Sequence, residues 1–406
     1  MSDTVQSLVN GVAHLFCFSH GCRMEAQANV ERVVIVGAGL AGLTVAYHLK
    51  SFGIEGLIVD KGGEIGASWS ARHQQLTLNT HRSVSHLPGL DYQSGTPAFP
   101  KRDDVVRHLK SFARRHAFPI SFNVDVTGIE KADSRFVITS SIGPFIAEHV
   151  VIATGRDRDP RWPQIRGVET FTGQRIHSSD FGDVKRYAAK RVLVVGGGNS
   201  GFDILNHLCH VDTEKVWLSV RSGSAVLPKR LRGIAVHRLS PLIEVLPSAF
   251  ADLAISFTQR LAFGSIQRFG FPKPARGAAT RLRCDHIAIP VDDGAMGAIK
   301  AGRIAVVREV DRVLGGRVHL AGGEIVEPDI LIAATGYGPS LGRALGGLSV
   351  LSAEGNPIVG SDNVSSNVPG LWFAGMTPGL VSYFRSADRE ARTIAAAVAA
   401  EPQKSS

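Results

Sequence analysis

The sequence predicts an α/β fold built from two doubly wound units, each with a parallel sheet. Two glycine clusters, one in each half of the chain, carry this prediction. Each cluster follows a short apolar run, expected as a strand, and precedes a stretch expected as a helix. Such strand–turn–helix units are typical of Rossmann-like dinucleotide-binding domains. The clusters are Gly37, Gly39 and Gly42 in the first half, and Gly196, Gly198 and Gly201 in the second.

Internal repetition supports the same architecture, because each half ends in an apolar strand that closes on Ala-Thr-Gly. In the first half, strands and a helix alternate and then give way to a small antiparallel meander. The meander leads to a separate buried strand over 150–155. The expected elements are strands 32–36 and 56–60, helix 40–51, and meander strands 124–129, 136–140 and 145–147.

The second half repeats this plan, with a hairpin turn at Gly315-Gly316 in its own meander. A strand at 371–374 and an alanine-rich helix are expected to return to the first unit, which makes that unit discontinuous. The expected elements are helix 201–209, strand 215–220 and meander strands 304–310, 317–320 and 324–326. The expected domains are a tail at 1–29, a first unit at 30–185 and 326–406, and a second unit at 186–325 with an insertion at 226–295.

One helix of the insertion carries an apolar face made of Phe250, Leu253, Ala254, Phe257 and Leu261. We expect this face to pack on the second nucleotide-binding unit. The alternatives are a lid or wall over a substrate channel, or a patch that touches a membrane.

Composition narrows the function classes. Hydrophobic residues make up 44% of the chain and charged residues 20%, which is typical of a globular protein. The formal charge of +9 is scattered rather than gathered in basic runs, so a nucleic-acid partner is not expected. No apolar run is long enough to span a membrane.

The four cysteines form no CxxC pair, which fits a reducing cytoplasm and argues against a dithiol reductase. His14, Cys17, His20 and Cys22 match no zinc spacing, so no metal is expected. Met24 is a candidate for the true start of the chain.

The residue at the end of the second strand distinguishes the two nucleotides. Asp60 holds this position in the first unit, where a carboxylate accepts hydrogen bonds from ribose hydroxyls, as FAD or NAD requires. The second unit has Arg221 and Ser222 instead, and arginine suits a 2′-phosphate. Lys229 and Arg230 are expected to add positive charge there. The assignment is therefore FAD in the first unit and NADPH in the second.

A further motif lies ahead of the second glycine turn and reads F-x-G-x-x-x-H-x-x-x-F from Phe171 to Phe181. This pattern resembles the fingerprint of the flavin-containing monooxygenases. Residues 289–304 resemble the plant YUCCA subfamily, the indole-3-pyruvate monooxygenases, and their bacterial relatives. The other segments that share the likeness are 67–69, 198–201, 334–337 and 370–375.

The resemblance and the glycine turns together name the candidate site residues. Asn79 resembles an active-site asparagine, and His177 is expected to hold the linker in register, with direct acid–base chemistry as the alternative. A turn-forming role is the alternative for Asn79. The candidate cofactor-binding residues are Gly37, Gly39, Gly42, Asp60, Lys61, Trp69, Thr154, Gly155, Gly196, Gly198, Asn199, Ser200, Gly201, Arg221, Ser222, Thr335, Gly336 and Gly375.

The resemblance implies an NADPH- and O2-dependent FAD monooxygenase that acts through a C4a-peroxyflavin on a small organic substrate. Indole-3-pyruvate is the first candidate substrate, and other keto acids, amines and sulfides stay open. Two alternatives remain. One is a flavin-dependent NADPH oxidase or reductase that releases hydrogen peroxide, and the other is a non-catalytic nucleotide-binding protein.

Overall fold

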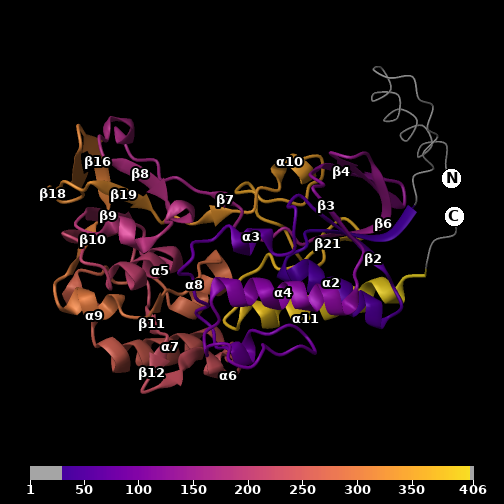
Figure 1. Ribbon diagram of the computed structural model, residues 1–406, viewed down its shortest axis with the longest axis horizontal. Coiled ribbons are helices and arrows are strands. Elements are labelled where there is room, and N and C mark those ends of the chain that lie inside the picture. Colours follow the sequence, from indigo (N-terminus) through magenta and orange to yellow (C-terminus); the bar gives the residue numbers. More distant parts are fainter. Residues whose placement is uncertain (1–29, 403–406) are drawn as a thin grey trace.

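Two α/β units lie side by side along the long axis of the molecule (Figure 1). The structure is a computed structural model that describes residues 30–402. The predictions for His14, Cys17, His20, Cys22 and Met24 therefore lie outside the described residues.

The first unit is built on a seven-stranded sheet with the order β3-β2-β1-β6-β5-β4, and β21 pairs with β6. β1 runs parallel to β2 and β6, and β21 runs parallel to β6, so the C-terminal part returns to this sheet. The predicted α/β class is confirmed. The strands are β1 (Val30–Val36), β2 (Gly56–Asp60), β3 (Ile120–Phe122), β4 (Val126–Ala132), β5 (Arg135–Ser140), β6 (Phe145–Ile152) and β21 (Leu371–Phe373).

The meander of the first unit differs from the expectation in one respect. The strand expected at 145–147 and the buried strand expected from 150 form a single strand, β6, so the prediction of two strands is wrong. Glu148 and His149 lie buried in the middle of this strand. β6 pairs antiparallel with β5 on one side and parallel with β1 on the other, and so joins the meander to the parallel sheet.

The second unit has a five-stranded, fully parallel sheet with the order β15-β10-β9-β19-β8. The strand expected at 304–310 is in fact two strands, and the first of them belongs to this sheet rather than to the meander. β16, β17 and β18 form the antiparallel meander, with the predicted turn at Gly315-Gly316. The strands are β8 (Gln174–His177), β9 (Arg191–Val195), β10 (Lys215–Val220), β15 (Ile304–Arg308), β16 (Val310–Leu314), β17 (Arg317–Leu320), β18 (Ile325–Val326) and β19 (Ile330–Ala333).

Strand pairing also shifts the expected domain boundaries. The expected boundaries at 185 and 326 assign β8 and β19 to the first unit, whereas both strands pair within the second sheet. The two connections between the units run antiparallel to each other as β7 (Asp159–Pro160) and β20 (Tyr337–Gly338).

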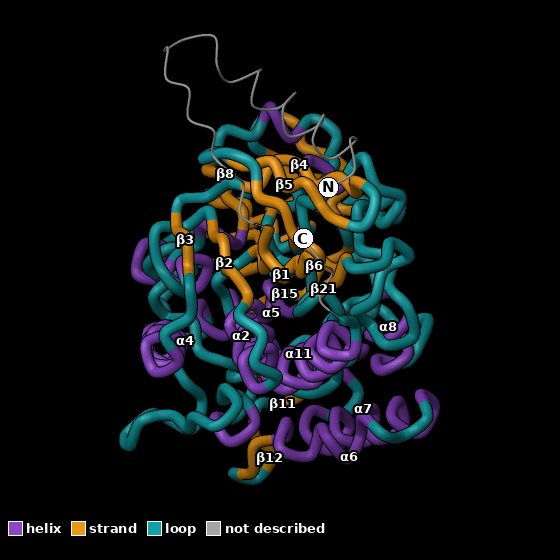
Figure 2. The backbone as a smooth tube through the Cα atoms, turned by 90° about the vertical axis from the view of Figure 1, so that its right-hand side faces the viewer, coloured by secondary structure: helices purple, strands orange, loops and turns teal. Residues whose placement is uncertain are grey.

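Helices cover the sheets. α2 (Leu40–Ser51), α4 (Arg102–His116) and α11 (Tyr383–Ala400) lie together below the first sheet (Figure 2), where their apolar faces share one core with β1. α5 (Asn199–Leu208) and α9 (Ala295–Lys300) share a core with β9 and β10 in the second unit. The opposite face of that sheet packs against the meander. Two short helices, α3 (Ala67–Ser70) and α10 (Gly342–Leu345), lie in connections.

The insertion forms a helical subdomain whose packing differs from the expectation. α7 buries Ala251 and Ile255 against α8, while Phe250, Leu253, Phe257 and Leu261 are exposed. The prediction that this apolar face packs on the nucleotide-binding unit is therefore wrong. The elements are β11 (Leu227–Pro228), β12 (Arg230–Leu231), β13 (Ile234–Ala235), α6 (Ser240–Glu244), α7 (Ser248–Phe263), α8 (Ala278–Asp285) and β14 (Val291–Asp292).

Candidate active site

The first glycine turn connects β1 to α2 in a conformation that needs glycine. Gly37 has φ +119°, and its N–H donates to Val59 O at 2.8 Å. A Cβ on Gly42 would lie 1.9 Å from Gly37 O, so the helix can approach the turn only without a side chain. A Cβ on Gly39 would meet no atom within 4 Å. This open position at the start of α2 leaves room for a ligand phosphate beside the first N–H groups of the helix.

Asp60 braces the same turn from the end of β2. Its two carboxylate oxygens accept hydrogen bonds from Ala38 N at 2.5 Å and Gly62 N at 2.6 Å. The carboxylate therefore lies at the mouth of the turn, where a ribose would bind, and each oxygen keeps a second lone pair. Lys61 is exposed next to it, and Trp69 is half-buried against the first core.

The second glycine turn has the same geometry. Gly196 has φ +116°, and a Cβ on Gly201 would lie 2.0 Å from Gly196 O. A Cβ on Gly198 would meet nothing within 4 Å, as at Gly39. Asn199 and Ser200 form the first turn of α5, and Arg221 and Ser222 are exposed just after β10. The guanidinium of Arg221 therefore lies at the strand end where a 2′-phosphate-binding arginine is expected.

Each Ala-Thr-Gly segment lies against its own glycine turn. A Cβ on Gly37 would lie 2.5 Å from Ala153 O, and a Cβ on Gly196 would lie 2.5 Å from Ala334 O. Thr154 Oγ1 is buried without a hydrogen-bond partner in the described structure. Such an orphaned hydroxyl beside an open turn fits a bound polar cofactor. The equivalent Thr335 instead donates to a backbone carbonyl of the linker.

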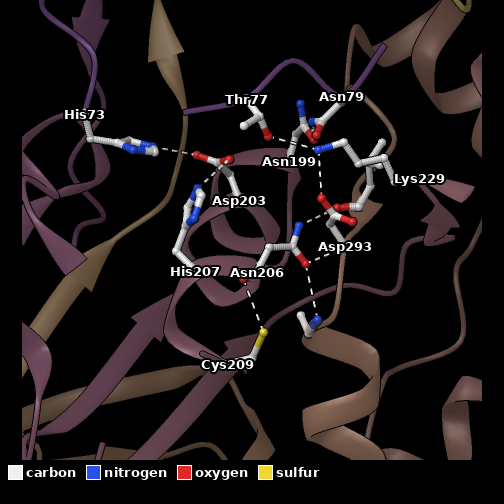
Figure 3. Close-up of polar contacts among 12 residues, drawn as sticks. His73, Thr77, Asn79, Asn199, Asp203, Asn206, His207, Cys209, Lys229 and Asp293 are labelled. Atoms are coloured by element: carbon white, nitrogen blue, oxygen red, sulfur yellow. Dashed lines mark hydrogen bonds and ion pairs between the residues drawn. The ribbon is translucent and has the colours of Figure 1, made fainter. Parts of the chain in front are cut away.

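The two units meet where the loop after α3 faces the second glycine turn (Figure 3). Asn79 Nδ2 donates to Asn199 Oδ1 at 3.1 Å. Two residues earlier, Thr77 Oγ1 accepts a hydrogen bond from Lys229 Nζ at 2.9 Å. The contacts bring Asn79 to the start of α5, the helix that follows the second glycine turn.

Lys229 lies at this junction, and its expected addition to the positive charge at Arg221 stays a prediction. It is only 4% exposed, and Nζ also donates to Asp293 Oδ2 at 2.8 Å. Asn206 of α5 fixes that partner by accepting from Asp293 N at 2.8 Å. Arg230 stacks 4.4 Å from the centre of the Phe99 ring. Sequence spacing gave no sign of these contacts.

A second interdomain cluster was also missed by the sequence reasoning. His73, from the loop after α3, lies 2.8 Å from Asp203 of α5, and His207 lies 3.7 Å from the other carboxylate oxygen. Burial raises the pKa of Asp203, but the hydrogen bonds from His207 and His73 outweigh it and lower the pKa to about 2. The three groups could ligate a metal ion, and the hydrogen bond between His73 and Asp203, with His207 close to the same carboxylate, accounts for their arrangement without one.

His177 is fully buried with both ring nitrogens occupied. Nδ1 accepts from Ser179 N at 3.2 Å, so Nε2 carries the proton and donates to Gly336 O at 3.2 Å. Burial lowers the pKa of His177, which keeps the ring neutral near pH 7. The ring therefore ties β8 to the turn after β19. This geometry favours a positioning role over acid–base chemistry.

Gly375 lies at the other edge of the first nucleotide site, with φ +68°. Two residues of α11 hold Gly375. The Gly375 N–H donates to Glu390 Oε2 at 2.6 Å, and the Tyr383 hydroxyl donates to the Gly375 carbonyl. Burial raises the pKa of Glu390 to about 7. Glu390, which the sequence did not single out, thus holds the turn that precedes α11.

Comparisons with known proteins agree with this geometry. A model of the pyridine nucleotide-disulphide oxidoreductase family matches residues 34–245. The chain is 31% identical over 322 residues to a probable indole-3-pyruvate monooxygenase, YUCCA7 of Arabidopsis thaliana, covering 76% of this chain and 74% of that protein. It is 30% identical over 321 residues to the indole-3-pyruvate monooxygenase YUCCA8 of Oryza sativa subsp. indica, covering 75% of each.

Solved structures share the fold. A flavin-containing monooxygenase from Stenotrophomonas maltophilia superposes with a TM-score of 0.72 at 22% identity, covering 92% of this chain and 99% of that one. Cyclohexanone monooxygenase in an open form superposes with a TM-score of 0.67 at 17% identity, covering 91% of this chain and 88% of that one. The chain belongs to the flavin-containing monooxygenase family, whose members are oxidoreductases that use a flavin and a pyridine nucleotide.

Proposed function

We propose that this enzyme binds FAD at the first glycine turn and NADPH at the second, and uses O2 to oxygenate a small organic substrate. The contact between Asn79 and Asn199 carries the proposal, because it joins the loop beside the first site to the helix of the second. The residues that would hold the two nucleotides therefore meet at one junction, which a transfer of hydride between the cofactors would require. The family consists of oxidoreductases, so a non-catalytic nucleotide-binding protein is set aside.

The residues present fit both cofactors. Open positions at Gly39 and Gly198 leave space for the two pyrophosphates, and the orphaned Thr154 hydroxyl offers a hydrogen bond on the FAD side. Asp60 suits a ribose, and Arg221 suits a 2′-phosphate. When bound, the flavin accepts hydride and activates O2, chemistry that no side chain of the site supplies.

The protein's own contribution is positioning and charge. The Asn79 amide can donate to a bound group while Asn199 fixes its orientation. Lys229, almost fully buried and paired with Asp293, supplies a fixed cation beside this loop. Polar groups that are held in place before a substrate binds need less reorganisation during the reaction than the same groups free in solvent.

The charge around the site favours an anionic substrate. Burial and the charges of Arg238, Arg82 and Arg230 lower the pKa of His81, which follows the Asn79 loop. The guanidinium group of Arg82, which is next to His81, would offer a counter-charge to a substrate carboxylate at this loop, and the two plant relatives are named for a keto acid, indole-3-pyruvate. Keto acids, with indole-3-pyruvate first, are therefore the proposed substrate class.

A coupling assay tests the proposal. The flavin-loaded enzyme is given NADPH, O2 and a panel of keto acids, amines and sulfides, and oxidised product is compared with hydrogen peroxide and NADPH consumed. The proposal expects about one product per NADPH for at least one keto acid, with little peroxide. Stoichiometric peroxide without product for every compound would instead identify an NADPH oxidase.

A further inference from the structure

An apolar ridge lies on the outer surface of the insertion. Nine of the seventeen exposed large apolar side chains among the described residues fall within residues 234–261. The other eight are spread over the rest of the chain between Val30 and Ile358. Five ridge residues are between 62 and 80% exposed: Leu242, Val245, Phe250, Leu253 and Phe257. The apolar ridge consists of these five together with Ile234, Leu239, Leu246 and Leu261.

The ridge forms one continuous face. Phe250, Leu253, Phe257 and Leu261 follow at intervals of three and four residues, which places them on one side of α7. The opposite side of α7 packs through Ala251 against α8. α6 and the β12–β13 hairpin lie beside α7 at the lower edge of the molecule in both views (Figures 1 and 2). The exposed face is therefore turned away from both sheets.

Positive charge borders the ridge. Residues 230–268 contain five arginines, all exposed, and two carboxylates. The carboxylates serve the body of the protein, since Glu244 accepts from Arg389 and Asp252 accepts from the N–H groups that begin α8. None of the five arginines forms an ion pair with a carboxylate of residues 30–402. They are Arg230, Arg232, Arg238, Arg260 and Arg268.

We propose that the apolar ridge docks this enzyme on the surface of an anionic lipid bilayer. An apolar face beside arginines is typical of segments that lie in the membrane interface. Charge decides between this occupant and a second copy of the chain, because a symmetric dimer would bring two arginine borders together, whereas anionic lipid neutralises them. The proposed contact lies at the surface of the bilayer, and residues 30–402 contain no helix that could span it.

Vesicle sedimentation tests the docking. The flavin-loaded full chain is pelleted with vesicles of phosphatidylcholine alone and of equal parts phosphatidylcholine and phosphatidylglycerol. We expect at least about tenfold stronger binding to the mixed vesicles, weakened by salt. Leu253→Ser/Phe257→Ser should reduce this binding at least about tenfold, and Arg238→Gln/Arg260→Gln should remove the preference for anionic lipid.

The matched control is Phe52→Ser/Ile142→Ser, which removes a similar exposed apolar pair from the first unit. It should bind vesicles like the unchanged enzyme. The proposal would be overturned if Phe52→Ser/Ile142→Ser lost as much vesicle binding as Leu253→Ser/Phe257→Ser. It would also be overturned if the unchanged enzyme showed no preference for anionic vesicles. A dimer in size-exclusion chromatography that Leu253→Ser/Phe257→Ser dissociates would overturn it as well, because the occupant would then be a second copy.

A conservative substitution covers the case in which the serine variant fails to fold. Phe257→Trp places a fluorophore on the ridge, and Phe52→Trp places one on the control surface. Brominated phosphatidylglycerol vesicles should quench the tryptophan fluorescence added at 257 and leave that added at 52 unchanged. Equal quenching at the two positions, or none at 257, would contradict the docking.

Discussion

His73 and Asp203 join the two nucleotide-binding units through a 2.8 Å hydrogen bond between Nε2 and a carboxylate oxygen. His73 is buried on the first unit, and Asp203 projects from α5 of the second. The bond therefore holds the helix that starts at Asn199, and with it the second glycine turn, against the first unit.

A double-mutant cycle measures this link. Asp203→Asn and His73→Gln should each lower the free energy of unfolding by about 1–3 kcal/mol, because each leaves a buried polar group poorly paired. Their effects should be non-additive by at least about 0.5 kcal/mol. Glu327→Gln, which breaks an exposed pair with Arg317, is the control and should change stability by under about 0.5 kcal/mol. Strictly additive effects of the two variants would show that the groups do not interact.

Alanine substitutions separate the two glycine turns. Gly42→Ala should yield protein with at least about tenfold less bound flavin, because the new Cβ meets a backbone oxygen that cannot move aside. Gly201→Ala should keep its flavin but lose most NADPH-dependent reduction. Gly297→Ala in α9 has no neighbour within 4 Å of its Cβ and is the control. Visible absorbance gives the flavin content. If Gly201→Ala lost flavin and Gly42→Ala kept it, the flavin would belong to the second glycine turn and NADPH to the first.

Arg221→Ala tests the choice of NADPH. Loss of charge-assisted hydrogen bonds to the 2′-phosphate should raise the KM for NADPH about 10–100-fold and leave the KM for NADH nearly unchanged. Arg343→Ala, an exposed arginine of the first unit, is the matched control. If steady-state kinetics show the same change for both coenzymes, Arg221 does not read the phosphate.

Glu390 predicts a pH dependence of stability. Its pKa is raised from 4.5 to about 7 in the folded protein, so its carboxyl group favours folding below pH 4.5 and loses this advantage as pH rises to 7. Glu390→Gln keeps an acceptor for Gly375 N–H but does not titrate. Relative to the unchanged enzyme, the free energy of unfolding of the variant should rise between pH 4.5 and 7, and the difference should reach about 3 kcal/mol above pH 7. Thermal unfolding of both proteins across this pH range checks the prediction. If their stabilities change with pH in parallel, the pKa of Glu390 is not raised.

The elements around both glycine turns could be predicted from the sequence to within a few residues, because apolar runs and glycines impose them locally. The sequence predicts two strands in place of β6 because Glu148 and His149 interrupt its apolar run, although both are buried. The sequence predicts one strand in place of β15 and β16 because β-branched residues continue past Arg308, where β15 ends. The apolar face of α7 was expected to be buried, because helical spacing identifies an apolar face but does not show whether another element covers it.

The candidate site was predictable only where a motif fixes the backbone. Gly37, Gly196 and Asp60 lie where their motifs place them in a dinucleotide fold. The contacts that join the units come from residues far apart in sequence, such as Thr77 with Lys229, and no local pattern records them. Glu390 likewise meets Gly375 only because α11 folds back under the first sheet.

Anaerobic mixing of the flavin-loaded enzyme with NADPH tests most directly that one chain holds both cofactors within reach of each other. The visible absorbance of the bound flavin should bleach rapidly with NADPH, far more slowly with NADH, and much less in Gly201→Ala. A preparation that binds no flavin after reconstitution, or one whose flavin NADPH never reduces, would contradict the account.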